Sequence, residues 1–600
     1  MKFPTLEEIK TSRTMVDTFR GYNHNLRISE SEFYDMENLT SNHYPVLSPR
    51  NARGTAISNV TPQAMIAKDS LCYIDGTYFV MNEYRVDMGL TAGEKQLVSM
   101  GAYVIILPDK KYINTKDLTD FGNIEASFPA TEGQKVTATY EMCNLSGVEY
   151  DVRSAKKSPT APENPNNMDL WIDTSSVPNT LKQYSATNAV WSPIATTYIK
   201  ISTPNIAASF KQYDAVKITG LPTDTSQFAD LEGKVSPLWA VYHDKGDEQI
   251  GRAEGTDDYV IVVGFLDEVK TVESALRLER TMPKMDFIIE SENRLWGCRY
   301  GLSANGTVVN EIYASKLGDF KNWNCFMGLS TDSYAASCGT DGQFTGAITY
   351  LGYPIFFKER CMHKIYGNFP SNFQIQTTAC DGVQKGSHKS LAIVNGVLYF
   401  KSRSAICGYD GSLPTGLSTE LGEVIYSEAV ACGHAHKYYI SMKDESGAWN
   451  LFVYDTKKGL WHKEDNLHVK DFCSCRDELY YIEEGGTTIR TIQGSGTKDS
   501  DPIKWMAETG VIGISSPDKK YVSRMSIRLS LNVGTRIHLY VQYDSNGEWE
   551  LIHELVGTRL RTFTVPIRPR RCDHLKLRIE GDGDAKIYSI TKTTEEGSDV

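Results

Sequence analysis

The sequence has no apolar run long enough to cross a membrane as a helix. Such a helix needs about 18 or more consecutive apolar residues, and the strongest apolar run, residues 259–265, has the length of a strand. Residues 1–8 also lack the apolar core of a signal peptide. We therefore expect a protein without a membrane segment that is made in the cytoplasm.

Positive charge and proline are both scarce. Lys and Arg total 63 against 75 Asp and Glu, a net charge of −12, which argues against broad binding to nucleic-acid phosphates. The 47 glycines clearly exceed the 22 prolines, and the 33 tyrosines lead the aromatics. Glycine turns and tyrosine-rich segments favour many short strands. At 600 residues the chain is too long for one core, so several domains are expected.

Recognisable catalytic motifs are missing as well. The sequence has no Gly-x-Ser-x-Gly, no Walker phosphate loop, no His-Glu-x-x-His and no Gly-x-Gly-x-x-Gly that opens a helix. Asp169 with Asp173, and Asp477 with Glu478, are acidic pairs of a kind that chance alone produces. Glycosidase geometry cannot be inferred from such spacing. We therefore predict a protein that is not an enzyme and holds no cofactor.

What the sequence does contain is a repeat. Phe356, Tyr399, Tyr439 and Tyr480 lie in similar strand-like segments separated by 43, 40 and 41 residues. Each segment is followed within about a dozen residues by another of the same kind. A unit of about 40–45 residues with about four short strands is typical of a β-propeller blade. Stacked β-sandwiches of hairpins would give the same period, and we favour the propeller.

Two earlier segments fit the same pattern. Residues 71–74 and 78–81 flank Asp75-Gly76, a strong hairpin signal, and residues 287–297 read as strand, turn and strand. We predict an all-β chain built on a propeller of six or seven blades. Its domains are an arm (1–54), first propeller strands (55–120), inserted small β modules (121–275), the remaining blades (276–500) and a β-sandwich (501–600).

The first fifty residues are polar and lack a clean period. Residues 6–17 are compatible with a short helix, and residues 19–49 read as an extended arm. Such an arm needs a surface to lie on, either its own propeller or a neighbouring subunit. Our hypothesis is that residues 19–50 dock on a neighbouring protein. The candidate assembly residues are Phe19, Arg20, Gly21, Tyr22, Asn23 and Arg50.

One cluster has the residue types of a metal site. Alternate residues of a strand share a face, and two neighbouring blades could bring such residues together with zinc-like ligand types. Cys-x-Cys is not the usual zinc spacing, however, so we expect no metal. The candidates are Cys432, His434, His436, Cys473 and Cys475.

Tryptophans near turns could stack on sugars, but a role in the hydrophobic layers is favoured. They are Trp171, Trp191, Trp323, Trp461 and Trp549.

Two parts of the sequence resemble a known family. The arm, through residues 19–28, 32–39 and 44–50, is similar to the opening of virion proteins from phages and prophages of Gram-positive gut bacteria. Residues 293–297 and 311–323 resemble a segment of phage tail hub or nozzle proteins, also called packaged-DNA stabilisation proteins. The resemblance covers about two-thirds of the chain.

The resemblance implies a structural, non-enzymatic protein of the virion tail. Members of the family form a ring, commonly of six copies, below the portal and adaptor of short-tailed phages, and the genome passes through it. The implied partners are copies of the chain itself, the portal-adaptor or neighbouring tail proteins, tail fibres, and passing double-stranded DNA bound without sequence specificity. A negatively charged channel would repel the DNA phosphates, so DNA would slide through it without binding.

Two other functions fit the predicted fold. One is a carbohydrate-binding or carbohydrate-cleaving propeller at a tail tip or on a cell surface. The other is a cytosolic interaction scaffold, which only the fold supports. Fold alone does not decide among them.

Overall fold

The computed structural model describes residues 11–223, 226–247, 251–513, 519–557, 559–567 and 570–596. Regular elements in these ranges are β-strands and short 3-10 turns: η1 (Ser226–Asp230), η3 (Pro370–Asn372), η4 (His388–Ser390) and η5 (Thr419–Leu421). The prediction of an all-β chain is confirmed. Over the same ranges, no helix has the length and apolar character that a membrane crossing would require.

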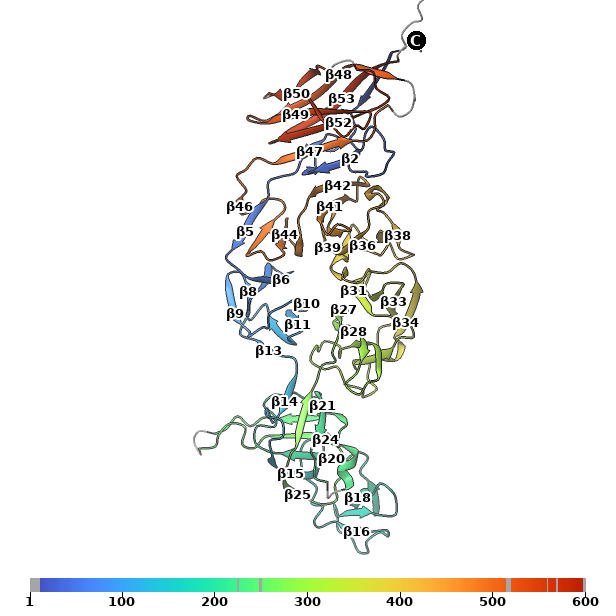
Figure 1. Cartoon of the computed structure of the whole chain (residues 1–600). Helices are drawn as coiled ribbons and strands as arrows, with labels where there is room; N and C mark the ends of the chain where they lie inside the picture. The colour runs from blue at the N-terminus through green and yellow to red at the C-terminus, as the bar shows by residue number, and fades with distance from the viewer. Residues whose placement is uncertain are drawn as a thin grey trace, which may run out of the picture. The chain divides into compact units, whose positions relative to one another are not determined.

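The chain divides into two compact units. The first comprises Met1–Leu97, Asp341–Lys364 and Gln376–Val600, and the second comprises Val98–Thr340 and Ile365–Ile375. Their strands are drawn in Figure 1.

The chain repeatedly forms four-stranded sheets in which hydrogen-bonded strands are also consecutive in the sequence. Four lie wholly or mostly in the first unit: β6 (Pro62–Ala67), β7 (Leu71–Asp75), β8 (Tyr78–Met81) and β9 (Tyr84–Asp87); β31 (Phe344–Tyr350), β32 (Tyr353–Lys358), β33 (Cys361–Tyr366) and β34 (Gln374–Ala379); β35 (Ala392–Val394), β36 (Val397–Lys401), β37 (Ile406–Tyr409) and β38 (Thr415–Gly416); β39 (Tyr426–His434), β40 (Lys437–Asp444), β41 (Trp449–Asp455) and β42 (Leu460–Asp465). Two lie mostly in the second: β10 (Gln96–Met100), β11 (Tyr103–Leu107), β12 (Lys111–Asn114) and β13 (Phe121–Asn123); β27 (Phe287–Ser291), β28 (Arg294–Leu302), β29 (Val308–Ala314) and β30 (Tyr334–Ser337).

A seventh sheet takes one strand from the N-terminal region. It consists of β43 (Val469–Cys475), β44 (Glu478–Glu483), β45 (Thr488–Thr491), β5 (Gly54–Ser58) and β46 (Thr497–Lys498). Figure 1 shows the blue β5 beside the orange β46 of the same sheet. Because β5 pairs antiparallel with β45 on one side and β46 on the other, it is an internal strand of a sheet otherwise made more than 400 residues later.

The predicted repeat corresponds to these sheets. Phe356, Tyr399, Tyr439 and Tyr480 each lie in the second strand of their sheet, in β32, β36, β40 and β44. Within the first unit, consecutive sheets of the repeat share buried clusters: β32 packs with β36, and β40 packs with β44. The Asp75-Gly76 turn joins β7 to β8, as the hairpin signal predicts.

The first and last of these sheets in chain order pack against each other within the first unit. Met65 in β6 donates its backbone N–H to Oδ2 of Asp471 in β43, at 2.8 Å. Val80 of the first sheet shares one buried cluster with Ile482 and Ile489 of the last.

Thr55 offers a direct test of the internal position of β5. It faces Arg490 on one side and Thr497 on the other, and proline cannot donate to a strand ladder. We expect Thr55→Pro to lower the melting temperature and to open residues 54–58 to limited proteolysis. Thr55→Val, which keeps the N–H and the branched side chain, is the control. Equal stability of the two variants would contradict the pairing.

The inserted segment runs from Ala126 to Arg280 in the second unit. It contains three sheets, in the strand orders β14-β26-β21-β22, β23-β24-β20-β15-β25 and β16-β17-β18-β19. Their bounds are β14 (Ala126–Phe128), β15 (Val136–Cys143), β16 (Lys156–Ser158), β17 (Leu170–Asp173), β18 (Thr180–Ser185), β19 (Val190–Pro193), β20 (Tyr198–Ser202), β21 (Ala215–Thr219), β22 (Val235–Pro237), β23 (Ala240–Tyr242), β24 (Tyr259–Val263), β25 (Lys270–Ser274) and β26 (Arg277–Arg280). The first two sheets share a core that includes Ile199, Ile218 and Val260.

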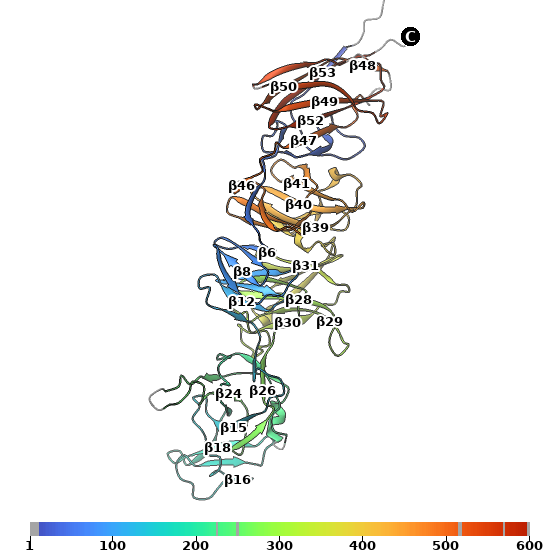
Figure 2. The same cartoon turned by 60° about the vertical axis from the view of Figure 1, so that its left-hand side comes forward.

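The C-terminal region forms two facing sheets, β1-β53-β48-β51 and β2-β47-β52-β49-β50 (Figure 2). Their bounds are β1 (Thr11–Val16), β2 (Phe33–Glu37), β47 (Lys504–Thr509), β48 (Lys520–Leu531), β49 (Arg536–Tyr543), β50 (Glu550–Val556), β51 (Arg561–Val565), β52 (Leu575–Asp582) and β53 (Ala585–Glu596). Ile527 and Leu539, from opposite sheets, belong to one buried cluster. Each sheet thus takes one strand from the N-terminal arm.

The prediction of a short helix over residues 6–17 is wrong for residues 11–16. Residues 6–10 lie outside the described residues, and Thr11–Val16 form β1. This strand pairs antiparallel with β53, with Thr11 opposite Glu595 and Val16 opposite Ile590. The pairing partner lies at the other end of the chain, so local sequence could not reveal it.

Candidate functional site

The candidate site is residues 19–53 of the arm, together with the parts of the first unit on which they lie. The arm passes along β42 and η5, adds β2 to the sandwich, forms the small hairpin β3 (Leu39–Thr40) and β4 (Ser48–Pro49), and leads into β5. Phe19, Tyr22 and Phe33 join a single buried cluster that also contains Trp461 of β42 and Trp505 of β47. The arm is therefore part of the core of this unit.

The first contact of the arm depends on a glycine. Gly21 has φ +85°, and a Cβ placed there would lie 2.3 Å from the carbonyl oxygen of Trp461. The next residue, Tyr22, donates its backbone N–H to that same oxygen at 2.7 Å. His24 then donates its backbone N–H to the carbonyl of Glu420, also at 2.7 Å. Only glycine permits this approach of two backbones.

The middle of the arm is held by both neighbouring sheets. Asn38 donates its backbone N–H to the carbonyl of Glu464 in β42, and its side-chain amide donates to the carbonyl of Lys504 in β47 at 2.9 Å. Ser41 donates its hydroxyl to Oδ2 of buried Asp455 at 2.6 Å. Burial raises the pKa of Asp455, but its hydrogen bond from Ser41 and the nearby lysines outweigh burial and lower it.

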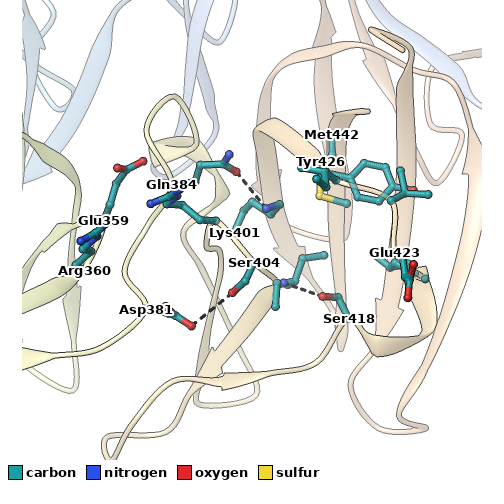
Figure 3. A pocket seen from close by; sticks show the side chains of 17 residues that line it. Glu359, Arg360, Asp381, Gln384, Lys401, Ser404, Ser418, Glu423, Tyr426 and Met442 are labelled. Carbon is teal, nitrogen blue, oxygen red and sulfur yellow. Dashed lines mark hydrogen bonds between the residues drawn. The ribbon is translucent and has the colours of Figure 1, made fainter. Parts of the chain in front are cut away.

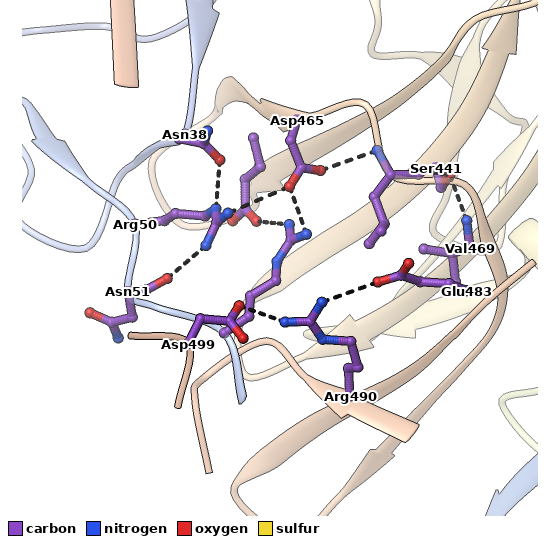
Figure 4. A network of polar contacts seen from close by, with 12 residues as sticks. Asn38, Arg50, Asn51, Ser441, Asp465, Val469, Glu483, Arg490 and Asp499 are labelled. Atoms are coloured by element: carbon purple, nitrogen blue, oxygen red, sulfur yellow. Dashed lines mark hydrogen bonds and ion pairs between the residues drawn. The ribbon is translucent and has the colours of Figure 1, made fainter. Parts of the chain in front are cut away.

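The end of the arm carries an ion network (Figure 4). Arg53 is 5% exposed and pairs with Glu464 at 3.1 Å and with Asp465 at 2.6 Å. Arg50 approaches Asp465 at 3.6 Å and donates to Oδ1 of Asn38 at 2.7 Å. Burial opposes the charge of Arg53, but Asp465 and Glu464 more than offset it and raise the pKa of Arg53.

The six predicted assembly residues lie mostly against this chain itself. Phe19, Gly21 and Tyr22 are buried, Asn23 is half-buried, and Arg50 belongs to the ion network. The side chain of Arg20 is the only exposed one of the six. Of the two surfaces considered for the arm, its own chain is the one observed. Docking of residues 19–50 on a neighbouring protein would have to use other, exposed positions, and it stays a hypothesis.

The Cys/His candidates do not converge on one point. Nδ1 of His434 lies 2.9 Å from the hydroxyl of Ser474 on the adjacent β43, and burial lowers the pKa of His434. Burial raises the pKa of the Cys432 thiol to about 12 and raises that of Cys473 as well, so both thiols stay protonated. His436 lies at the hairpin between β39 and β40, and Cys475 is buried. Within the described ranges, no three His, Cys, Asp or Glu side chains are grouped to hold a metal ion.

Three of the four residues in the acidic pairs, Asp169, Asp173 and Glu478, have partners within the chain. Asp173 pairs with Lys182 at 2.8 Å, and Asp169 accepts the backbone N–H of Asn166 at 2.7 Å. Glu478 accepts hydrogen bonds from the backbone N–H groups of Gln493 and Ser495. These carboxylates thus have structural partners.

The candidate tryptophans mainly serve the packing. Trp461 is 1% exposed and donates its indole N–H to the carbonyl of Leu417 at 2.8 Å, and Trp323 is 2% exposed. Trp171 is buried, whereas Trp191 and Trp549 are half-buried. The guanidinium carbon of Arg578 lies over the ring of Trp549, 4.2 Å from the ring centre.

Comparison with known proteins identifies no family. No family model and no curated protein matches this chain. Among solved structures, an exo-beta-1,3-galactanase from Phanerochaete chrysosporium aligns at 8% identity and a TM-score of 0.19, covering 51% of this chain and 94% of its own. PorZ of Porphyromonas gingivalis, a surface component of the type-IX secretion system, aligns at 11% identity and a TM-score of 0.26. This alignment covers 84% of this chain and 70% of PorZ. The extracellular domain of BT4673 from B. thetaiotaomicron aligns at 8% identity and a TM-score of 0.22. This alignment covers 92% of this chain and 98% of that domain. TM-scores this low assign neither fold nor function.

Proposed function

We propose that the seven repeated sheets are the blades of a β-propeller. Six are four-stranded meanders, and the seventh is completed by β5 from the N-terminal side of the chain. Supplying a strand from the opposite end of the chain is a common way to close a propeller. The packing of the first sheet against the last, through Met65 and Asp471, supports the same closure.

We further propose that the protein is a structural component of a phage tail, a nozzle or hub subunit below the portal and adaptor. In this role copies of the chain form a ring that is part of the DNA exit channel and helps to retain the packaged genome. Its partners are the portal-adaptor or neighbouring tail proteins and tail fibres. The net charge of −12 supports passage of DNA without tight binding.

The observation that carries this proposal is the arm. The segments through which it resembles phage virion proteins, residues 19–28, 32–39 and 44–50, include positions with strict geometric roles. Gly21 permits the backbone contact with Trp461, Asn38 joins two sheets, and Arg50 belongs to the ion network. These contacts give the arm a defined place in the fold, and this supports the proposal that the arm is a built-in part of a tail protein.

The composition of purified particles tests the proposal. Particles from cells that carry the gene would be banded in a density gradient, washed with salt, and analysed by quantitative mass spectrometry. We expect the chain at several copies per particle, as a ring requires, and in the fraction that keeps its tail. If the chain is abundant in the lysate and absent from salt-washed particles, the proposal is wrong.

A further inference from the structure

The first unit contains a cavity whose lining includes none of the residues of the ion network described above. It has a volume of about 750 Å3 and lies where the ends of three consecutive sheets meet. The turn between β32 and β33, the segment after β34, the end of β36 and the start of β39 all contribute to it (Figure 3). Small-molecule sites typically occupy about 300–1,000 Å3, so a sugar-sized ligand would fit.

A buried cation without an acidic partner lines this cavity. The side chain of Lys401 is only 3% exposed, and its ammonium donates to Oε1 of Gln384 at 3.1 Å and to the carbonyl of Ser402. Both acceptors are neutral. Within the described residues, no carboxylate lies within ion-pairing distance of Lys401. Because an uncompensated buried charge is costly, an anionic group from a ligand would be complementary to it.

Two exposed guanidinium groups add to the positive side of the lining. Arg360 and Arg403 both line the cavity and are exposed. In the part of the chain that the structure describes, neither forms an ion pair. Guanidinium groups bind carboxylates in a planar, two-pronged geometry. A guanidinium at this lining can therefore bind a ligand carboxylate beside Lys401.

The same cavity also presents acidic groups and an apolar side. Glu359, Asp381 and Glu423 line it, and carboxylates can accept hydrogen bonds from hydroxyl groups. Their negative charge would oppose a doubly charged phosphate more than a singly charged carboxylate. The apolar lining is formed by Leu421, Val424, Ile425 and Met442.

From these features we propose that the cavity binds a hydroxylated monocarboxylate of sugar size, that is, an acidic sugar of the uronic-acid type. Lys401 and Arg403 hold the carboxylate, the three acidic residues accept hydrogen bonds from the hydroxyls, and the apolar side covers the C–H face of the ring. This inference does not depend on the proposed tail function, because it rests on the cavity alone.

Calorimetric titration of the full chain at pH 7 tests the site. The probes are glucuronate, glucose and inorganic phosphate, with a glucuronate-containing disaccharide as a further arm that separates a free sugar from a polysaccharide source. We expect glucuronate to bind with one site per chain, and glucose and phosphate at least about tenfold more weakly, since charge-assisted hydrogen bonds distinguish them.

Two variants locate the binding. Lys401→Met should weaken glucuronate binding about tenfold or more, and Arg403→Gln about threefold or more. Arg403 is exposed, so its variant tests the site even if Lys401→Met fails to fold. Lys457→Met, an exposed lysine outside the cavity, is the matched control and should bind normally. The proposal is overturned if glucuronate does not bind, if glucose or phosphate binds as tightly, or if Arg403→Gln leaves the affinity unchanged.

The pH dependence gives a second readout. Burial lowers the pKa of Lys401 to about 8, so its ammonium loses its proton as the pH rises through that value. The other charged or titratable groups that line the cavity, or that act on Lys401, are Glu359, Arg360, Asp381, Arg403, Cys407, Glu423 and Tyr426. Glucuronate affinity should therefore fall about tenfold from pH 7 to pH 9. An affinity that is unchanged over this range would contradict the role of Lys401.

Discussion

Replacing Arg53 with methionine is expected to destabilise the first unit by about 3–5 kcal/mol, the usual cost of leaving a buried acidic group without its partner. Arg53 and Glu464 are both nearly fully buried, and Asp465 is 19% exposed. The variant removes the cation and leaves both carboxylates in place. Thermal unfolding followed by circular dichroism would measure the loss as a lower melting temperature of this unit.

Arg490→Met is the matched control. Arg490 pairs with Asp499 at 2.5 Å and with Glu483 at 3.5 Å in the same network, but these carboxylates are 47% and 38% exposed. Exposed ion pairs contribute at most about 1 kcal/mol. A double variant that also carries Glu464→Gln should recover part of the loss. Equal destabilisation by Arg53→Met and Arg490→Met would show that burial does not govern this network.

The second large effect is expected from Gly21→Ala. A left-handed φ costs a non-glycine residue about 1–2 kcal/mol, and the approach of Cβ to the carbonyl of Trp461 adds an overpacking cost of about 1–3 kcal/mol. The expected loss is therefore about 2–5 kcal/mol. The backbone hydrogen bond from Tyr22 to Trp461 would be displaced with it. Denaturant unfolding, with hydrogen exchange at Tyr22, would report both changes.

Gly396→Ala separates the two contributions. Gly396 has φ +81°, close to the +85° of Gly21, and a Cβ there would meet nothing within 4 Å. It should therefore show the cost of the backbone conformation alone. If the two alanine variants lose the same free energy of unfolding, the close contact between the arm and β42 adds no destabilisation in Gly21→Ala.

The repeat could be predicted from the sequence because its signal is local. Each sheet has its own hairpins, and the aromatic residues of the second strands, such as Tyr399 and Tyr439, recur every 40–43 residues. The sandwich strands were predictable for the same reason, since β48 and β49 alternate apolar and polar residues. The turn at Asp75-Gly76 is a third local signal.

The path of the arm could not be predicted, because its conformation depends on remote partners. Thr11–Val16 are extended only through pairing with β53, and Gly21 owes its role to an oxygen 440 residues away in the sequence. Arg53 and Lys401 gave no sequence signal either. Each is a single basic residue at or next to the end of a strand. Only the fold gives Arg53 two carboxylate partners and leaves Lys401 with neutral acceptors.

The location of the protein in particles tests the central claim most directly. Intact virions would be labelled with gold through an antibody against residues 501–600 and viewed by electron microscopy. The tail proposal predicts gold at the tail vertex of each particle, and its height along the tail would separate a nozzle from a tip. Gold absent from particles, with the protein free in cells or medium, would contradict the proposal.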